Sequence, residues 1–584
     1  MLIDSLPLLR DYSDKLPLLR EIVDDAFVDK VAGFDAEDQL LLLSLVAAGQ
    51  GHLLEGDLLK VCDDVRDVED FYADVGGIIG YQSLVLNKLS ASKESFSYEP
   101  PKTVDISKEN AAIDIGLGNL GELGEIYPVG GAAERLQLRD SGRDMPAAML
   151  HFLSGNLLEG LVRDVEAREF LFFQRFGVQL ITPIALMTSH VKQGHAQVMD
   201  ILEKNSWFGR GRENFKVFSQ PLVPAFDERG VWARDKNGLV LKPGGHGVLW
   251  KLMEREGVFD WFAAKGRSKA LVRQINNPVS GADYGLLSFV GTGFLQEKMF
   301  GFATCAPAKH AKEGRVVVSK GKSGACLSNV EYCSFAQHGI SETSAFPANA
   351  NILFCDLEYV REVAREHPFP GMIVNFKNGL ARLETTMQNI ADWIPVAESY
   401  ATLHERCKTL SVAKREYVKG EGLLETPLGA LFDYLKNGRE LLKKFCGMDV
   451  PEIGDEESGP QFFFEYHPAL GPLYRDIGKK IRGGKLAKGA ELCLEISDLV
   501  LENLQLDGSL RVETRFVTGH FEGERQLFSE RAASCVMRNV KIEGSLKVTL
   551  GENSKFIAED VVIRGDHVVD VPDGGVLSFP NNNL

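Results

Sequence analysis

Apolar residues near the beginning of the chain recur at steps of three and four, which is the spacing of one face of a helix. Residues 18–23 show this spacing, and a longer apolar run follows at residues 40–48. Strand-like alternation is rare in this part of the chain. The pattern therefore predicts a helical region over residues 1–95.

The middle of the chain alternates short apolar runs with helical patterns. The apolar runs that indicate strands lie at residues 179–187, 285–290, 314–318 and 352–357. Helical patterns cover residues 157–176 and 190–204. Buried strands interleaved with helices are typical of a three-layer α/β fold with a largely parallel sheet. A stretch rich in Ser, Lys and Pro at residues 89–108 indicates a linker before this region.

The end of the chain changes to an alternating pattern that repeats. Residues 503–512 read NLQLDGSLRV, residues 539–548 read NVKIEGSLKV, and residues 560–569 read DVVIRGDHVV. Alternating Leu, Val and Ile with regularly placed glycines predict strands and corners. We predict a small β-helix-like or β-roll domain over residues 460–584, which leaves residues 96–459 for the α/β domain. A Greek-key sandwich would show similar alternation without the internal repeat.

Composition agrees with a soluble globular protein of about three domains. The chain has 584 residues, of which 44% are hydrophobic and 25% are charged. Its net charge of −17 repels polyphosphate backbones, so broad nucleic-acid binding is not expected, although a local basic pocket is compatible with it. Nine cysteines without a CxxC pair exclude a disulfide framework and a thiolate zinc site.

The sequence also predicts the compartment of the protein and whether it enters a membrane. The cysteine pattern favours a reducing compartment. The first residues, MLIDSLPLLRDYSDK, resemble neither a signal peptide nor a transit peptide, and no apolar run approaches the ~20 residues of a membrane span. We therefore expect a cytosolic (cytoplasmic) protein that does not enter a membrane.

Two glycine-rich loops are candidates for binding a nucleotide. The first is Gly130-Gly131 with Arg135 close behind: glycines let backbone N–H groups approach phosphate oxygens, and an arginine adds a bidentate fork. The second is KPGGHG, with Gly245 and His246, which together with Gln220 suits the flat polar edge of a base. The alternatives are a structural turn for the first loop and a mobile surface loop with an ordinary histidine for the second.

Polar residues after other strand-like runs complete the set of candidates. Lys377 follows the apolar string MIVNF, where a lysine can neutralise a phosphate, and an ordinary surface lysine is the alternative. The segments FPANAN and Asn276-Asn277 offer amides. No HExxH, GxSxG or GxxxxGK[ST] motif is present, which argues against metalloprotease, esterase-type and P-loop readings.

The order of these segments resembles that of the UDP-sugar pyrophosphorylases, the UTP:sugar-1-phosphate uridylyltransferases. The strings PVGGAAERL, QPLVPA, KPGGHGVLWKL, FPANANIL and RLETTMQNIAD are most similar to the plastid-type branch of plants and its bacterial relatives. The likeness runs from about residue 122 to the end of the chain. It implies a GT-A-like (Rossmann-like) nucleotidyltransferase core with a C-terminal β-helix.

The resemblance also assigns roles to residues. It implies that Arg135 and Lys377 stabilise the transferred phosphate. The residues implied to bind the nucleotide are Gly130, Gly131, Gln220, Gly245 and His246. The residues implied to bind the sugar are His195, Asn277, Asn349 and Asn351. Mg²⁺ is the implied cofactor.

The chain departs from the family pattern at two positions. Ala147 stands where most members have a lysine, and Asn276 stands where they have the aspartate that holds Mg²⁺, so the metal ligands are unknown. The plastid-type branch shares both departures, so neither by itself indicates an inactive enzyme.

The reaction that the resemblance implies uses UTP and glucose-1-phosphate and gives UDP-glucose and pyrophosphate. A sugar-1-phosphate is already an anionic nucleophile, so the reaction needs positioning and charge stabilisation rather than a general base. Two alternatives stay open: the same transfer onto another sugar phosphate, such as N-acetylglucosamine-1-phosphate, and a uridine-nucleotide-binding regulator that has lost catalysis. The oligomeric state is not predicted.

Overall fold

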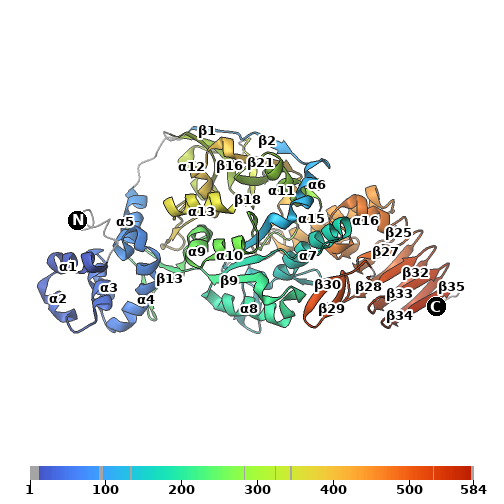
Figure 1. Ribbon diagram of the computed structural model, residues 1–584, viewed down its shortest axis with the longest axis horizontal. Helices are drawn as coiled ribbons and strands as arrows, with labels where there is room; N and C mark the ends of the chain where they lie inside the picture. The colour runs from blue at the N-terminus through green and yellow to red at the C-terminus, as the bar shows by residue number, and fades with distance from the viewer. Residues whose placement is uncertain are drawn as a thin grey trace.

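The computed structural model describes residues 12–90, 97–131, 135–281, 283–321, 324–341, 345–530 and 532–580. The molecule is elongated, with helices at the N-terminal end, a mixed α/β region in the middle and stacked strands at the C-terminal end (Figure 1). Among the described helices, none has both the length and the apolar character needed to cross a membrane.

Helices occupy the region in which the apolar spacing predicts them. They are α1 (Tyr12–Ile22), α2 (Asp25–Val31), α3 (Ala36–Ala47), α4 (Leu58–Phe71) and α5 (Gly77–Ser90). Helix α3 is buried along most of its length because the other helices surround it. Residues 1–11 and 91–95 of the predicted helical region lie outside the described residues.

Buried amides fix this helical region against the middle of the chain. The backbone N–H of Trp232 donates to Gln50 at 2.8 Å, and its indole N–H donates to Gln82 at 2.7 Å. The hydroxyl of Tyr81 donates to the carbonyl of Pro224 at 2.9 Å. Buried polar groups need such partners, so these bonds hold the helices in one orientation.

One large sheet forms the middle of the molecule. Its main path runs in the order β2 (Thr103–Asp105), β21 (Ser399–His404), β15 (Phe300–Cys305), β18 (Ala348–Asp356), β14 (Lys269–Arg273), β3 (Leu123–Pro128), β8 (Ile184–Thr188) and β9 (Phe215–Ser219). Strand β18 is antiparallel to both neighbours, and the other pairs on this path are parallel. The helices that pack against the sheet include α7 (Leu157–Phe176), α8 (Gly194–Lys204), α11 (Gly285–Leu295) and α13 (Leu357–Glu366). The predicted α/β class is therefore confirmed.

Two local predictions in this region are wrong. Residues 285–290 form the start of helix α11 and not a strand; the helix is buried on nearly all sides, and a short apolar run cannot distinguish a buried helix from a buried strand. Part of the predicted linker belongs to the sheet, because β1 (Ser97–Glu99) pairs with β16 (Arg315–Gly321) and β2 pairs with β21.

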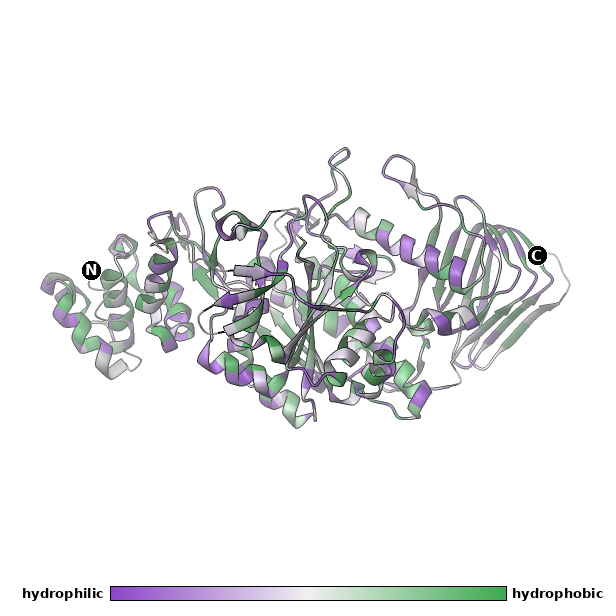
Figure 2. Cartoon of the chain, turned by 90° about the horizontal axis from the view of Figure 1, so that it is seen from above, coloured by the Kyte–Doolittle hydropathy of each residue, from purple (hydrophilic) through white to green (hydrophobic). Residues whose placement is uncertain are grey.

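Parallel strands stack in the C-terminal region, as the repeat predicts. One sheet contains β24 (Phe463–Tyr466), β26 (Glu491–Glu495), β28 (Gln505–Thr514), β32 (Lys541–Leu550) and β34 (Val562–Val571). A second contains β27 (Asp498–Val500), β31 (Ser534–Met537), β33 (Lys555–Glu559) and β35 (Val576–Pro580). Figure 2 shows these strands side by side at one end of the molecule. Because they are parallel, the β-helix prediction is confirmed and the Greek-key alternative is wrong.

The copies of the sequence repeat lie in register with one another in this stack. Gln505 pairs with Lys541, and the pairing continues residue by residue to the ends of β28 and β32. Gly508 has φ +136°, and a Cβ there would lie 1.9 Å from the carbonyl oxygen of Gly544 in the next strand. The repeated glycine is therefore required by the close approach of neighbouring coils.

The buried face of the stack gives a first prediction. Ile542 is fully buried in β32, so Ile542→Asp places an unpaired charge in the core and should lower the free energy of unfolding by more than about 3 kcal/mol. Val568, on the neighbouring strand β34, is 71% exposed, so Val568→Asp should change it by less than about 0.5 kcal/mol. Urea unfolding followed by circular dichroism measures both, and equal stability of the two variants would contradict the assignment of the inward face.

Candidate active site

The first glycine-rich loop follows β3, at the edge where β8 also ends. A Cβ on Gly130 would lie 2.4 Å from Nε2 of Gln220 and 2.7 Å from the carbonyl oxygen of Thr188, so only glycine fits there. Gly131 is exposed, and a Cβ on it would meet nothing within 4 Å. We call residues 127–136 the phosphate loop; its first glycine allows tight packing and its second faces open space. Residues 132–134 lie outside the described residues.

Gln220 supports this loop from the end of β9. It is buried, its side-chain Nε2 donates to the carbonyl of Gly130 at 2.8 Å, and its backbone N–H donates to the carbonyl of Thr188 at 2.9 Å. The structure thus gives Gln220 a role in holding the phosphate loop. Its predicted contact with uracil stays a prediction.

The second glycine-rich loop follows β13 (Leu241–Pro243) and is bound to a neighbouring segment by backbone hydrogen bonds. Gly247 donates to the carbonyl of Thr385, and Thr385 donates to the carbonyl of Gly244, both at 3.0 Å. Gly245 has φ +90°, and a Cβ there would lie 2.5 Å from the same Thr385 carbonyl. The loop is therefore tightly held, in contrast to the mobile loop that was the alternative.

His246 is a neutral hydrogen-bonding group in this loop. Its Nδ1 accepts a hydrogen bond from the backbone N–H of Met387 at 3.0 Å. Burial, with a smaller effect from the positive charge of Lys414, lowers the pKa of His246 to about 4. Because Nδ1 accepts, the proton of the neutral ring lies on Nε2, which can donate but carries no positive charge at neutral pH.

Lys414 is a functional candidate that the sequence did not reveal. Lys414 lies in a segment without regular secondary structure. Among the described residues, its ammonium group has no hydrogen-bond or ion-pair partner. Burial lowers its pKa below the ordinary lysine value; the nearby Glu425 and Glu331 oppose this shift, and Arg135 adds to it. A partly buried, unpaired cation beside other charges is typical of a site that binds an anion. No periodic pattern or motif marks it in the sequence.

Arg135 lies next to the Lys414 segment. Its backbone carbonyl accepts from the N–H of Glu416 at 3.0 Å, and its guanidinium lies 3.7 Å from the carboxylate of Glu425. Its side chain is 41% exposed, so the fork remains accessible. The charge of Arg135 acts on Lys414, and the charge of Lys414 acts on His246, so Lys414 lies near both glycine-rich loops. We infer that the two loops face one shared cleft.

The predicted sugar-binding asparagines form a ladder of amides. Nδ2 of Asn349 donates to Asn329 and to Asn351, both at 3.0 Å, and Nδ2 of Asn351 donates to Gln274 at 3.2 Å. Asn329 in turn donates to Glu331 at 2.7 Å, which connects the ladder to the surroundings of Lys414. Amides of this kind suit sugar hydroxyls, and their role as sugar ligands stays a prediction.

Two other residues that the resemblance implies to bind the sugar, Asn277 and His195, lie in different surroundings. Asn277 is buried and both ends of its amide are bound, to the carbonyl of Thr409 at 2.7 Å and to the N–H of Ser411 at 3.1 Å. It therefore positions the chain that leads to Lys414. His195 and Thr188 share a hydrogen bond of 2.8 Å at the end of β8, where burial lowers the pKa of His195.

Lys377 is exposed on a tight turn. Its backbone pairs with Leu380, so the lysine lies at the tip between β19 (Ile373–Val374) and β20 (Leu383–Glu384). This exposure contrasts with the partial burial of Lys414. The role of Lys377 as the main cation on the transferred phosphate stays a prediction, to be compared directly with that of Lys414.

The described residues do not fit a metal ion held by the protein. No group of three or more His, Cys, Asp or Glu among them could hold one. Asn276 offers a side-chain oxygen that is buried and lacks a hydrogen-bond partner, but an amide is a weaker ligand than a carboxylate. Ala147, in the position of the family lysine, is buried in an apolar cluster. Mg²⁺ therefore stays a prediction, and its ligands are not assigned.

Comparisons with known proteins identify relatives of this chain. The model of the family described as UTP--glucose-1-phosphate uridylyltransferase matches residues 164–393, and the model described as "UGP3-like, C-terminal hexapeptide repeats" matches residues 481–545. UTP--glucose-1-phosphate uridylyltransferase 3, chloroplastic, of Arabidopsis thaliana is 37% identical over 89% of this chain and 70% of its own length. The UDP-sugar pyrophosphorylase of Oryza sativa subsp. japonica is 24% identical over 59% of this chain and 62% of its own.

A solved structure shows the same fold. The UDP-N-acetylglucosamine pyrophosphorylase of Trypanosoma brucei superposes with a TM-score of 0.57 at 18% identity, covering 76% of this chain and 95% of that one. The predicted resemblance and the nucleotidyltransferase fold are therefore confirmed. The prediction of a cytosolic protein is wrong, because the 37% identical relative is described as a chloroplastic protein.

The two glycines of the phosphate loop give a second prediction. Gly131→Ala should leave stability unchanged, because its Cβ meets only open space, yet weaken UTP binding about tenfold if phosphates approach the backbone there. Gly130→Ala is the matched control: it should lower the melting temperature even without ligand, because its Cβ collides with protein atoms. Calorimetric UTP binding and thermal unfolding measure the two effects. Unchanged UTP affinity in Gly131→Ala would remove this loop from the site.

Proposed function

Because the chain belongs to the UTP--glucose-1-phosphate uridylyltransferase family, we propose that it forms UDP-glucose and pyrophosphate from UTP and glucose-1-phosphate. The observation that supports this most directly is the unpaired cation of Lys414, in a cleft with Arg135 and the two glycine-rich loops. A triphosphate requires such a combination of cations and free backbone N–H groups.

The reaction is an in-line substitution at the α-phosphorus of UTP. A phosphate oxygen of glucose-1-phosphate forms the new P–O bond, while the bond to the oxygen bridging the α- and β-phosphates breaks. The electron pair of that bond leaves with pyrophosphate. The nucleophile is already an anion, so the protein supplies orientation and charge stabilisation and no general base.

We assign the binding of the substrates and the stabilisation of their charge to five parts of the protein in the cleft. Lys414 supplies a point charge on the transferred phosphate, and Arg135 supplies a fork for the outer phosphates. The backbone at Gly131 donates to phosphate oxygens, and the neutral ring of His246 donates from Nε2. The ladder of Asn349 and Asn351 is assigned to the sugar hydroxyls. Mg²⁺, when bound to UTP, adds charge neutralisation.

A pyrophosphate-release assay tests the activity. Purified protein with UTP and Mg²⁺ receives glucose-1-phosphate or N-acetylglucosamine-1-phosphate, and UTP binding is measured separately by calorimetry. We expect turnover with glucose-1-phosphate. Turnover only with N-acetylglucosamine-1-phosphate would make that compound the substrate. UTP binding without any turnover would favour the alternative of a uridine-nucleotide-binding regulator.

A third prediction compares the two lysines. Lys414→Met should lower kcat by about 10²–10³, which is the usual effect of removing one preorganised electrostatic group, whereas Lys377→Met should change it less than threefold. Turnover measured at saturating UTP and sugar phosphate distinguishes them. The opposite ranking would restore the sequence-based assignment of Lys377.

The lowered pKa of Lys414 gives a fourth prediction. The ammonium is needed in its charged form, and its pKa lies below the ordinary value of 10.5, so kcat/KM for UTP should fall as the pH rises through that lowered pKa. In Lys414→Arg the guanidinium stays charged, so this alkaline decline should disappear although kcat remains low. An unchanged alkaline limb in Lys414→Arg would assign the titration to another group.

A further inference from the structure

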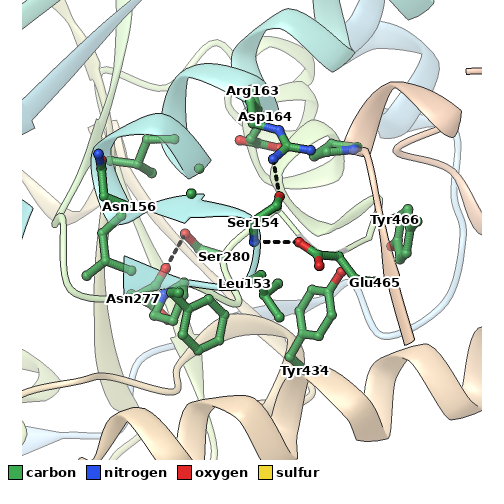
Figure 3. A pocket seen from close by; sticks show the side chains of 18 of the residues that line it. Leu153, Ser154, Asn156, Arg163, Asp164, Asn277, Ser280, Tyr434, Glu465 and Tyr466 are labelled. Atoms are coloured by element: carbon green, nitrogen blue, oxygen red, sulfur yellow. Dashed lines mark hydrogen bonds between the residues drawn. The ribbon is translucent and has the colours of Figure 1, made fainter. Parts of the chain in front are cut away.

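A cavity lies between the α/β region and the C-terminal region. It is distinct from the cleft between the two glycine-rich loops. Its volume is about 110 Å³. Figure 3 shows the side chains that surround it, which come from the start of α7, the loop after β14, helix α15 (Pro427–Glu440) and β24 with the chain that follows it. Residues distant in the sequence therefore meet around one space.

The walls of this cavity are mainly apolar. The apolar and aromatic residues that line it include Phe152, Leu157, Leu161, Ile275, Tyr434 and Tyr466. The rings of Tyr434 and Tyr466 stack with centroids 6.4 Å apart, and Phe152 meets Tyr434 edge-on at 6.3 Å. An enclosed apolar cavity of about 150 Å³ accepts benzene. This space is smaller but open to solvent on one side, so a single small ring is the largest group that it can surround.

A buried carboxylate forms the polar end. Glu465 is 5% exposed and lines the cavity. One of its oxygens accepts the N–H of Ser154 at 2.6 Å, and among the described residues the other has no hydrogen-bond partner. Arg163 also lines the cavity and is close enough for the charge of Glu465 to act on it, but its hydrogen bonds go to the hydroxyl of Ser154 at 2.5 Å and to Glu495. A buried carboxylate without a bonded cation favours a ligand that brings a positive charge.

A helical glycine keeps the space open. Gly160 lies in the first turns of α7 and lines the cavity, and a Cβ on it would meet nothing within 4 Å. Glycine inside a helix costs about 0.5–1 kcal/mol relative to alanine. The chain thus has room for a stabilising side chain at this position and leaves it unfilled.

The cavity is connected to the candidate active site through one loop. Asn277 lines the cavity, and its amide binds Thr409 and Ser411, while the carbonyl of Asn276 accepts the N–H of Ala413 at 2.8 Å. These bonds position the chain directly before Lys414. A ligand that packs against this loop therefore also affects the position of the catalytic cation.

We propose that the cavity is a regulatory site for a small molecule that consists of one ring and a protonated amine. The ammonium group binds Glu465, and the ring lies between Tyr434 and the aliphatic wall. Occupancy stabilises the loop containing Asn277 and so tightens the binding of UTP beside Lys414. The proposal rests on the assignment of UTP to the cleft.

Benzylamine is the probe, with benzyl alcohol and benzoate as neutral and anionic counterparts. We expect calorimetry on the full chain to show binding of benzylamine at least tenfold tighter than that of either counterpart, because only the amine pairs with the carboxylate. At saturating benzylamine the dissociation constant of UTP should fall at least threefold. By linkage, UTP should tighten benzylamine binding by the same factor.

Two variants and one control locate the effect. Gly160→Leu fills the cavity and should abolish benzylamine binding, and Glu465→Gln keeps the acceptor for Ser154 but removes the charge, so binding should weaken at least tenfold. Glu491→Gln, on the exposed side of β26, should change nothing. Unaltered UTP binding without benzylamine verifies that each variant is folded.

Several outcomes overturn the proposal. They are equal binding of the three probes, equal binding to Glu465→Gln and wild type, retained binding in Gly160→Leu, and an unchanged UTP dissociation constant when benzylamine is bound. The readout is UTP binding and not turnover. A protein that makes no UDP-glucose but shows the coupled binding would refute the proposed reaction and leave the regulatory site standing.

Discussion

A buried network of charges on β3, α7 and β14 holds together the elements that carry the site. Arg273 donates to Asp164 at 2.5 Å and to the hydroxyl of Tyr127 at 3.1 Å, and Arg168 bonds Asp164 at 3.0 Å and also Glu125. Removing one partner would leave a buried charge uncompensated, which costs about 3–5 kcal/mol. Because the phosphate loop follows β3 and the asparagine pair follows β14, this network fixes the spacing between the two sides of the cleft.

The cleft itself balances cations against carboxylates before any substrate arrives. Lys414 and Arg135 are opposed by Glu425 and Glu331, in a protein with a net charge of −17. Burial raises the pKa of Glu331, and burial lowers that of Lys414, so both charged forms are disfavoured in the empty cleft. The negative charge of a bound triphosphate would raise both pKa values, which favours the charged lysine and the neutral carboxyl and would make its binding depend on pH.

The sequence predicts the parts of this structure that depend on local patterns. The glycine-rich loops at residues 130 and 245 can be predicted because a side chain at either position would collide with neighbouring atoms, so only glycine occurs there. The β-helix can be predicted from the repeat because each copy of the repeat forms one coil of the stack. Lys414 could not be predicted in this way, since the chain before it is positioned by hydrogen bonds to Asn277, which is far away in the sequence. Helix α11 was misread because a helix buried on all sides has no polar face to reveal its period.

Helix α7 joins the candidate site to the C-terminal region through two stripes of side chains. Asp164 and Arg168, four residues apart, face the central sheet and complete the buried network. The other stripe consists of Arg163, Glu166 and Phe170, whose partners in the C-terminal region are Glu495, Thr518 and Phe528. One helix thus contacts the central sheet with one stripe and the C-terminal region with the other. The C-terminal region therefore supports the helix that holds β3 and β14, the two strands from which the candidate site is built.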